Sequence, residues 1–566
     1  MMSVDDFAHL HVHSVFSMTD GGSTVDELVT AAANMGQPAI GLTDHGCVSG
    51  LFDFWKACRK TGIKPVLGLE AYVTPETDRR DASSISWERT PGERRNPDDV
   101  GGNGRFTHLS LWAETDEGLS NLLAMSAAAN LEGRVGRYPR VDQQLLAQYA
   151  TGLICGSGCP SGAIQTRLRL GQFDDALRMA GELQDIFGRN SFFIEIMDHG
   201  LEIERRVRSG LLEIADKLNA PIVATADAHY AKAADRMTQE LRLCIESECH
   251  WDDPDRFRFD GDGYYLKSGE EMRQLFSDIP EACDNTLRIA ERCEANFHPQ
   301  PAGSLMPTSD YGPGKTANDA IRELAENGLR RLGVSMTDDV RERVAHELHA
   351  IRLVNAEEYL LAVADVKHRL QEEGHTFTPG EGIAAASLVC YALGITQVNP
   401  LKRGVTAQSF INEKKPVFPI LTLRTEPGLA RAARDILTER YGDDHVASTV
   451  AYTEFGRSNA VRAVARVLEY DGASDGSSDV ESADTWLREQ RHMNVQDRIA
   501  RFPQRRFVRE SSIVLSARPL PETTSLIQQV DGTVATALDL HACDELGIPR
   551  LNILGSIALA HVTDEE

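Results

Sequence analysis

The first 295 residues alternate short apolar segments with amphipathic ones, and this alternation constrains the fold most strongly. The apolar segments are short and rich in Val, Ile and Leu, which is typical of β-strands. They lie at 7–13, 39–45, 65–73, 107–113, 152–158, 192–197 and 221–229. The amphipathic spacing between them predicts helices at 24–35, 51–61, 117–131, 173–187 and 201–218. Seven strand-then-helix units indicate an α/β protein built on a barrel of parallel strands.

The length of the chain, its apolar runs and its cysteines limit the number of domains and the cellular compartment. A chain of 566 residues is longer than one hydrophobic core usually organises, so at least two domains are expected. The Pro/Gly-rich segment at 296–315 is the expected boundary between them. No run of eighteen apolar residues occurs, as a transmembrane helix would require. The N-terminus also lacks the basic segment and the following apolar segment of a signal peptide. Ten cysteines without a CxxC pair fit a reduced compartment. We expect a cytoplasmic protein with no membrane partner.

The formal charge of −26 bears on possible partners. It argues against a nucleic-acid binder that relies on its overall electrostatic field. A local basic groove stays compatible with it, and bound divalent cations would offset part of the charge in an active site. Net charge therefore does not decide whether the chain binds DNA.

Residue types that bind metals gather at the ends of the predicted strands. His11 and His13 alternate on the first strand, so both side chains leave the same face, and Asp227 and His229 do so on the seventh. The whole set comprises His11, His13, Asp20, His45, Glu70, His108, Cys159, Asp227 and His229. Most of these residues lie at or beyond strand C-termini, where parallel barrels build active sites.

Each of these residues alone has an ordinary explanation. A single strand histidine is more often a hydrogen-bonded core residue than a ligand, and Cys159 alone would be an inert buried thiol. Asp20 and Asp44 alone would be turn or helix N-cap residues. Nine such side chains at one end of one barrel, however, would be very costly to bury without a cation. The joint pattern predicts a metal site.

The mixture of residue types narrows the metal and the chemistry. Imidazoles, carboxylates and one thiolate suit Zn²⁺, Mn²⁺ or Fe²⁺ better than Mg²⁺ or Ca²⁺. Nine ligands exceed the need of one ion, so we expect two or three divalent ions, an arrangement suited to phosphoester cleavage. No Walker loop, GxSxG or HExxH pattern occurs. His199, in MDHG, could be a partner of a ligand, a substrate contact or a cap residue.

Seven segments of this first part closely resemble the PHP (polymerase and histidinol phosphatase) domain of bacterial DNA polymerase III alpha subunits, with the actinobacterial branch nearest. They are HLHVHSVFSMTDG, AIGLTDHG, FWKACRKTGIKPVLGLEAYV, GCPSGAIQTRLRLGQ, IMDHGLEIERRVR, ATADAHY and FRFDGDGYYLKS. The resemblance implies a distorted (β/α)7 barrel over 1–295, with a trinuclear metal cluster and 3′–5′ exonuclease activity on DNA. All nine ligand positions of that family match the nine residues above.

The resemblance also implies roles and partners. His11, His13, Glu70, Asp227 and His229 would be the catalytic residues, acting with the bound ions. DNA 3′ ends would be the substrate, and replisome components would be partners.

A fainter resemblance to the palm and thumb of the same polymerases covers the remainder. It is carried by EYLLAVADVKHRLQEEG, TPGEGIAAASLVCYALGITQVNPLKRG and ERYGDDHVASTVAYTEFGRSNAVRAVARVL. It implies an α+β palm-like region at 296–430 and 513–566, with a helical thumb-like insertion at 431–512. The sequence ends at Glu566, before the fingers and the clamp-binding region of such subunits.

The nucleotide-binding loop departs from the family pattern. The family loop PGRGSAAGS reads PGEGIAAAS here, with Glu381 for arginine, Ile383 for serine and Ala386 for glycine. An acidic side chain at a triphosphate site repels the ligand that should bind there.

The catalytic carboxylates of the family are also replaced. Its MPDxDIDF and KMDFLGLR segments supply three aspartates, and the matching positions here are Ile420, Thr422 and Asn552. Two-metal nucleotidyl transfer needs those anionic ligands. We therefore expect a degenerate, inactive polymerase site.

The main hypothesis from the sequence is a metal-dependent 3′–5′ exonuclease or phosphoesterase that acts on DNA and carries a vestigial polymerase region. Three alternatives stay open at this point. The chain could be a non-catalytic regulator or decoy of the replisome, a DNA-directed DNA polymerase as the family label suggests, or a hydrolase of small phosphomonoesters.

Overall fold

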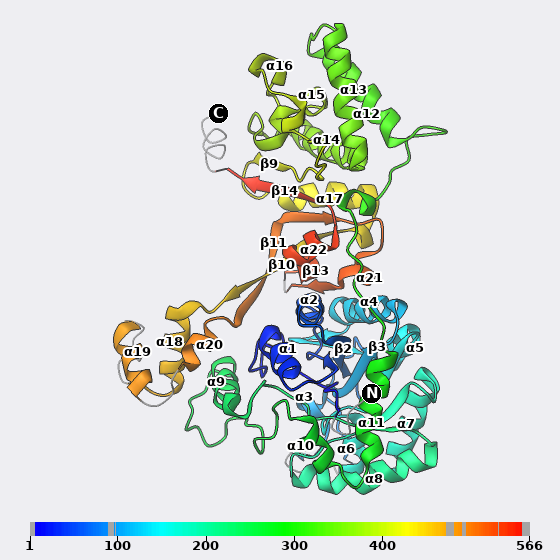
Figure 1. The fold of residues 1–566 in the computed structure, drawn as a ribbon, viewed down its shortest axis with the longest axis vertical. Coiled ribbons are helices and arrows are strands. Elements are labelled where there is room, and N and C mark those ends of the chain that lie inside the picture. Colours follow the sequence, from blue (N-terminus) through cyan, green and yellow to red (C-terminus); the bar gives the residue numbers. More distant parts are fainter. Residues whose placement is uncertain are drawn as a thin grey trace. The chain divides into compact units, whose positions relative to one another are not determined.

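A computed structural model describes residues 6–88, 96, 98–470, 480–489, 494–529 and 531–556 (Figure 1). The chain forms two compact units. The first unit comprises Met1–Phe297 and Tyr452–Arg506, and the second comprises His298–Ala451 and Phe507–Glu566. The finer division into a barrel, two palm-like parts and a thumb-like part stays a prediction.

An eight-stranded sheet lies at the centre of the first unit, in the order β4-β5-β2-β3-β6-β7-β8, with β1 paired to β2. Its strands are β1 (Ala39–Leu42), β2 (Lys64–Val73), β3 (Thr107–Ala113), β4 (Arg134–Val135), β5 (Tyr138–Val141), β6 (Leu153–Gly156), β7 (Phe192–Ile196) and β8 (Ile222–Ala224). The N-terminal segment closes the sheet into a barrel, because His9 pairs with Ile40 of β1 and Val12 pairs with Ala228 after β8. These isolated bridges replace the regular strand that we expected at 7–13.

One strand of the barrel runs against its neighbours. β3 is antiparallel to both β2 and β6, whereas β1–β2, β6–β7 and β7–β8 are parallel. The expectation of parallel strands throughout is therefore wrong for β3. Because β3 is reversed, its first residues lie beside the last residues of β2, and His108 sits opposite Tyr72. The reversal brings His108 to the end of the barrel that carries Glu70.

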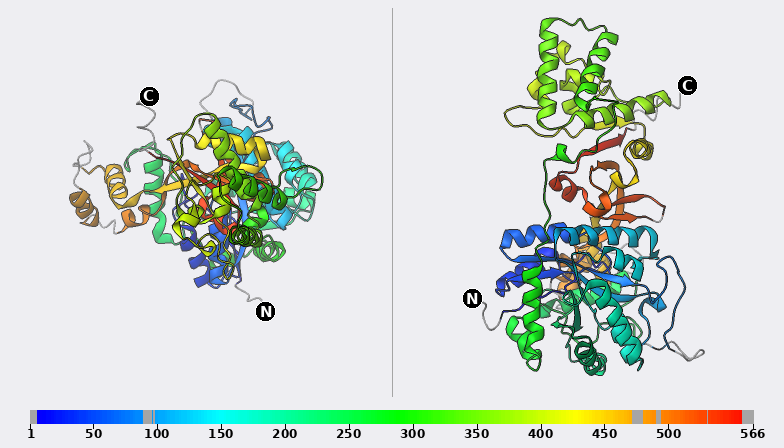
Figure 2. Two further views of the ribbon diagram at one scale, coloured as in Figure 1. Left: turned by 90° about the horizontal axis from the view of Figure 1, so that it is seen from above. Right: turned by 90° about the vertical axis from the view of Figure 1, so that its right-hand side faces the viewer.

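Helices lie outside the strands of the first unit (Figure 2). They are α1 (Val25–Asn34), α2 (Leu51–Thr61), α3 (Gly101–Gly104), α4 (Asp116–Glu132), α5 (Gln143–Tyr149), α6 (Ala163–Arg169), α7 (Phe173–Phe187), α8 (Glu202–Leu218), α9 (Arg236–Glu246), α10 (Gly269–Leu275) and α11 (Pro280–Arg292). The five helices predicted from spacing are confirmed as α1, α2, α4, α7 and α8. Local capping supports these boundaries: Thr24 and Glu27 form a reciprocal capping box at the start of α1.

The described residues of the first unit that follow residue 451 include three helices. They are α18 (Gly456–Val467), α19 (Val480–Glu489) and α20 (Val495–Ile499). The apolar residues of this segment, including Val461 and Ile499, share one buried cluster with Val15 and with Leu241 of α9. Arg242, only 1% exposed, donates to the backbone oxygens of Val15 and Met18 beside the barrel end and of Pro503. This segment therefore belongs to the packing of the first unit.

The second unit contains most of a six-stranded sheet in the order β12-β13-β10-β11-β14-β9, with the last residues of β10 and the first residues of β11 counted in the first unit. Its strands are β9 (Thr422–Thr425), β10 (Val446–Glu454), β11 (Pro503–Leu515), β12 (Leu526–Gln528), β13 (Val534–Asp539) and β14 (Arg550–Gly555). Its helices are α12 (Ala317–Arg331), α13 (Asp338–Leu353), α14 (Glu357–Glu372), α15 (Leu388–Ala392), α16 (Pro400–Arg403), α17 (Ala430–Tyr441), α21 (Leu520–Thr524) and α22 (Leu540–Leu546). The unit is α+β. Among the described residues of both units, no helix combines the length and apolarity needed to span a bilayer.

The N-terminal segment is held in the barrel core by an indole. Trp112 of β3 is fully buried, packs in one cluster with Leu10, Val66 and Phe193, and donates its Nε1–H to the carbonyl oxygen of Leu10 at 2.9 Å. Leu10 directly precedes His11. The packing of β3 therefore fixes the backbone that carries the first two predicted ligands.

We predict that Trp112→Phe lowers the free energy of unfolding of the first unit by roughly 1–3 kcal/mol, because a buried carbonyl loses its donor. Urea denaturation followed by circular dichroism measures the change. Trp486→Phe, at a half-buried indole that contacts Tyr470, controls for the loss of an indole ring. Equal effects of the two substitutions would contradict a specific role for the Trp112 hydrogen bond.

Candidate metal centre

The centre is built around the carboxylate of Glu70, which β2 places at the barrel end with 1% exposure. Four imidazoles approach it. Its oxygens lie 2.5 Å from His45 Nδ1, 3.1 Å from His108 Nδ1, 3.3 Å from His11 Nε2 and 3.6 Å from His13 Nε2. Such a concentration of ligand atoms around one buried carboxylate is unusual unless the groups are paired or coordinate a cation.

Two further carboxylates complete the surroundings. Asp227 Oδ1 lies 3.0 Å from His13 Nε2 and 3.5 Å from both His11 Nε2 and His229 Nδ1. The oxygens of Asp20 lie 3.4 Å from His45 Nε2 and 4.0 Å from His229 Nε2. Asp20 follows the N-terminal segment, and Asp227 follows β8, so the closure of the barrel brings them together.

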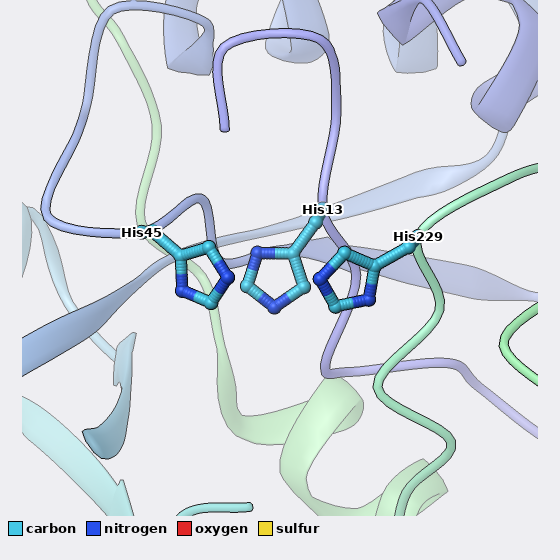
Figure 3. A group of neighbouring side chains, drawn as sticks. All are labelled: His13, His45 and His229. Atoms are coloured by element: carbon cyan, nitrogen blue, oxygen red, sulfur yellow. The ribbon is translucent and has the colours of Figure 1, made fainter. Parts of the chain in front are cut away.

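Three of the imidazoles form a row in which the ring of His13 lies between those of His45 and His229 (Figure 3). The ring centroids are 4.1 Å and 4.3 Å apart. Three groups of residues have ligand atoms that all lie within 4.8 Å of one another. These groups are His13, His45 and His229; His11, His13 and Glu70; and His45, Glu70 and His108.

Cys159 joins the cluster at its edge. Its Sγ lies 3.4 Å from His108 Nδ1, and the side chain is buried. Burial raises the pKa of this thiol well above its usual value, and the carboxylates of Glu70 and Asp227 raise it further. A nearby cation would be needed for Cys159 to act as a thiolate ligand.

All nine predicted residues thus lie in one connected cluster. Six of them belong to the three tight groups, whereas Asp20, Cys159 and Asp227 contact those groups from outside. Their roles as ligands stay predictions. Asp227 adopts a left-handed backbone with φ of +43°, which is uncommon for a non-glycine residue and is often found at functional sites.

Unsatisfied polar atoms test whether the cluster fits metal ions. Among the described residues, eight buried side-chain atoms of this cluster lie close to one another but make no hydrogen bond of acceptable angle, although such atoms are rarely left unpaired in proteins. They are His11 Nε2, His13 Nε2, Asp20 Oδ1, His45 Nδ1, both oxygens of Glu70, Asp227 Oδ1 and His229 Nε2. Cations would satisfy all of them, so the residues present fit a group of divalent ions.

The hydrogen bonds around the cluster orient three of the imidazoles. His11 Nδ1 lies 2.7 Å from Glu195 Oε1, His13 Nδ1 lies 3.1 Å from Ser17 Oγ, and His229 Nδ1 lies 2.8 Å from the Asp227 carbonyl oxygen. If each Nδ1–H donates to its oxygen, the Nε2 lone pair is left for an ion. These are the three Nε2 atoms that lack partners.

The electrostatics of the cluster keep its carboxylates ionised. Burial alone would raise the pKa of Glu70 and of Asp20, yet the surrounding imidazoles hold the pKa of each well below its usual range. Burial, with His45 and His229 close by, lowers the pKa of His13 to about 3. Burial also acts to lower the pKa of His45, but Asp20 and Glu70 outweigh it and raise that pKa well above its usual value. Anionic carboxylates beside a neutral His13 are suited to bind cations.

Exposure differs across the cluster and indicates where a substrate could approach. The side chains of His11, His13, Glu70 and His229 are at most 1% exposed. The side chains that reach solvent, at 12–14%, are those of Asp20, His45, His108 and Asp227. A substrate would therefore meet the centre on the side formed by these four residues.

Two residues that orient the ligands were not predicted as part of the site. Glu195 on β7 accepts from Ser110 Oγ, Thr225 Oγ1 and Gly158 N in addition to its contact with His11. Its signal in the sequence is a glutamate within the otherwise apolar strand FFIEIM.

Asp44, interpreted from sequence as an ordinary turn or cap residue, accepts from the backbone N–H and hydroxyl groups of Ser14 and Ser17. Because the Ser17 hydroxyl donates to Asp44, its oxygen can accept from His13. Asp44 thus fixes the loop that orients His13.

His199, for which three roles were open, lies away from the tight groups. Its Nδ1 is 2.5 Å from Glu204 Oε1, its Nε2 is 2.8 Å from the Ala226 carbonyl oxygen, and its ring stacks on Tyr264 at 4.2 Å. These contacts indicate that His199 supports the wall of the site.

The second unit brings together the positions predicted to replace polymerase carboxylates. Thr422 of β9 is paired with Asn552 of β14 in parallel register, and Asn552 Nδ2 lies 3.4 Å from Thr422 Oγ1. Asn552 Oδ1 accepts from Arg550 at 2.8 Å and from Ser512 at 3.2 Å. The Ile420 side chain is 39% exposed.

The acidic side chain of the altered loop also has a partner within the protein. Glu381 forms an ion pair with Arg424 of β9. Both are surface side chains, so the pair contributes little to stability.

Comparisons with known proteins find relatives of both parts of the chain. The PHP domain family matches residues 9–199, and the bacterial DNA polymerase III alpha NTPase domain family matches residues 319–555. The DNA polymerase III subunit alpha of Mycobacterium tuberculosis is 35% identical over 606 residues, covering 99% of this chain and 50% of that protein. The corresponding subunit of Saccharopolyspora erythraea is 35% identical and covers 98% of this chain and 50% of its own length. The chain spans about half the length of these curated relatives.

Among solved structures, a putative metal-dependent phosphoesterase from Bifidobacterium adolescentis shares 14% identity and covers 48% of this chain and 96% of its own. The TM-score is 0.24, too low for a structural argument.

We predict that Glu195→Gln lowers the affinity for Zn²⁺ or Mn²⁺ roughly 10- to 100-fold. The Glu195 carboxylate accepts from the backbone N–H of Gly158 and from two hydroxyl groups and contacts His11 Nδ1, so replacing one oxygen by an amide NH₂ places a donor against donors and disturbs His11. Competition with a chromogenic chelator measures the affinity. Glu347→Gln is the matched control, because Glu347 is also 1% exposed but lies in the second unit, where it accepts from the backbone of α15. Equal affinities of the Glu195 variant and the wild type would contradict the orienting role.

Proposed function

We propose that this chain is a metal-dependent 3′–5′ exonuclease acting on DNA. It matches the PHP domain family and the bacterial DNA polymerase III alpha NTPase domain family. It is also related over nearly its whole length to DNA polymerase III alpha subunits. The observation that carries the proposal is the buried cluster around Glu70, in which eight ligand-type side-chain atoms lack a hydrogen bond.

The proposed roles follow from the geometry. His11, His13, Glu70, Asp227 and His229 would hold two or three divalent ions, with further ligands on the exposed side. Such ions supply Lewis acidity for phosphoester oxygens and lower the pKa of a water molecule. The protein's own part is to fix the ligands: Glu195 and the Asp44–Ser17 pair orient His11 and His13.

The exposed side of the centre supports a phosphodiester at a chain end as substrate. Asp20, His45, His108 and Asp227 are each only 12–14% exposed, so little of the centre is open to solvent. A strand terminus fits such a site better than the middle of a duplex. Relatives named as polymerase subunits support DNA as the polymer.

We expect single-stranded and mispaired 3′ ends to be digested in the presence of Mn²⁺ or Zn²⁺. Asp227→Asn and His11→Ala should each reduce the rate about 100-fold or more, because each removes a group that touches the ions. Gel analysis of 3′-end digestion measures the rate, and the bound metal is measured in parallel.

A chelator should abolish digestion and added Mn²⁺ should restore it. His368→Ala, at an exposed histidine of the second unit, is the matched control. Digestion that survives both active-site changes would overturn the proposal. Hydrolysis of a small phosphomonoester without any digestion of DNA would favour the alternative substrate class.

A second proposal concerns the polymerase region, which we infer to be inactive in nucleotidyl transfer. Ile420, Thr422 and Asn552 offer no carboxylate, and the Asn552 amide is already engaged by Arg550, Ser512 and Thr422. Two-metal transfer requires anionic ligands at the metals. A non-catalytic role of this region, in guiding DNA or in binding replication proteins, is compatible with active chemistry in the first unit.

Primer extension with labelled nucleotides and Mg²⁺ or Mn²⁺ tests this second proposal. We expect no templated incorporation by the wild-type chain, and the alpha subunit of Mycobacterium tuberculosis serves as the positive control. Asp227→Asn is assayed alongside, so that degradation of the product does not hide synthesis. Template-dependent incorporation by either form would contradict the proposal.

A further inference from the structure

An aromatic side chain stands exposed beside the metal centre. Phe257 is 64% exposed, more than any other large apolar side chain among the described residues of the first unit. Its ring lies edge-on to Phe259, with centroids 5.7 Å apart, and Phe259 in turn lies edge-on to His229 at 4.7 Å. Two ring contacts thus connect the exposed Phe257 to an imidazole of the proposed metal cluster.

The inner ring of this series is held firmly. Phe259 contacts Tyr264 at 4.8 Å, and Tyr264 stacks on His199 at 4.2 Å with an interplanar angle of 17°. His199 is fixed by Glu204 and by the Ala226 carbonyl oxygen, and the Tyr264 carbonyl oxygen accepts from His229 N at 2.8 Å. The Phe259 ring is therefore held in place by its neighbours and supports the ring of Phe257.

The side chains around Phe257 indicate which kind of ligand this surface would bind. Exposed apolar residues that are scattered singly need no explanation, but Phe257 continues a line of rings that reaches His229. The exposed carboxylates of Asp252, Asp255 and Asp260 outnumber the exposed cation of this segment, Arg258, so the surface around Phe257 is acidic on balance and disfavours a phosphate backbone. An uncharged planar group suits this surface, and every nucleobase has such a face for stacking on an aromatic side chain.

We propose that Phe257, supported by Phe259, stacks on the base of the 3′-terminal nucleotide whose phosphodiester lies at the metal centre. The inference rests on the proposed exonuclease function and deepens it, because it assigns the recognition of the substrate terminus to a defined surface. Stacking of this kind tolerates any base. The surface would thus distinguish a terminus that carries a base from one that lacks it.

Two oligonucleotides test the inference: a single strand ending in thymidine, and the same strand ending in an abasic tetrahydrofuran residue. The wild type should cleave the thymidine end with a kcat/KM roughly 5- to 100-fold higher, by the usual strength of base–aromatic stacking. Phe257→Ala should remove this preference and leave the rate on the abasic end unchanged, whereas Phe257→Trp should retain it. A preference that persists in Phe257→Ala, or an equal loss on both substrates, would overturn the inference.

A binding measurement separates this inference from the proposed function. In Phe257→Trp, the thymidine-ended strand should quench the added tryptophan fluorescence, and the abasic-ended strand should quench it much less. The wild-type chain, which keeps its five tryptophans, gives the background. If no strand is cleaved but the quenching differs, the exonuclease proposal fails and base recognition stands. If both strands quench equally or not at all, base recognition by Phe257 is wrong.

Discussion

The burial of one carboxylate among four imidazoles is the constraint on which the first unit depends. Glu70 is 1% exposed and has His45 and His108 within 3.1 Å. Groups of this kind are costly to bury unless they are paired or bound to cations. The barrel offsets the free energy of burying these groups by placing opposite charges next to one another at one end. The same end gathers the lone pairs that a multinuclear metal site requires.

The surroundings of the cluster show that orientation matters as much as ligand identity. Glu195 and Asp44 each collect several donors from different strands and loops, and through these contacts they fix His11 and His13. A barrel end with the same ligands but loosely held rings would bind ions more weakly. The second unit differs, because the side chain of Asn552 is uncharged and is already hydrogen-bonded to neighbouring protein groups.

Much of the first unit could be predicted because its signals are local. Period-2 and period-3.6 patterns located the strands and helices, and the alternation of His11 with His13 predicted that both leave one face. The antiparallel direction of β3 could not be predicted, since a strand reads the same in either direction. The role of Glu195 was also hidden, because its partner His11 lies 184 residues away in the sequence.

The reversed strand β3 has a consequence for how this protein family can vary. β2 ends and β3 begins at the same end of the barrel, so the connection at 74–106 starts and finishes there. In topology it is a long hairpin connection, and both of its ends lie on the side of the barrel that carries His108. Lengthening such a loop costs little conformational entropy. Insertions and deletions there can reshape access to the ions while the strand register of the barrel stays as it is.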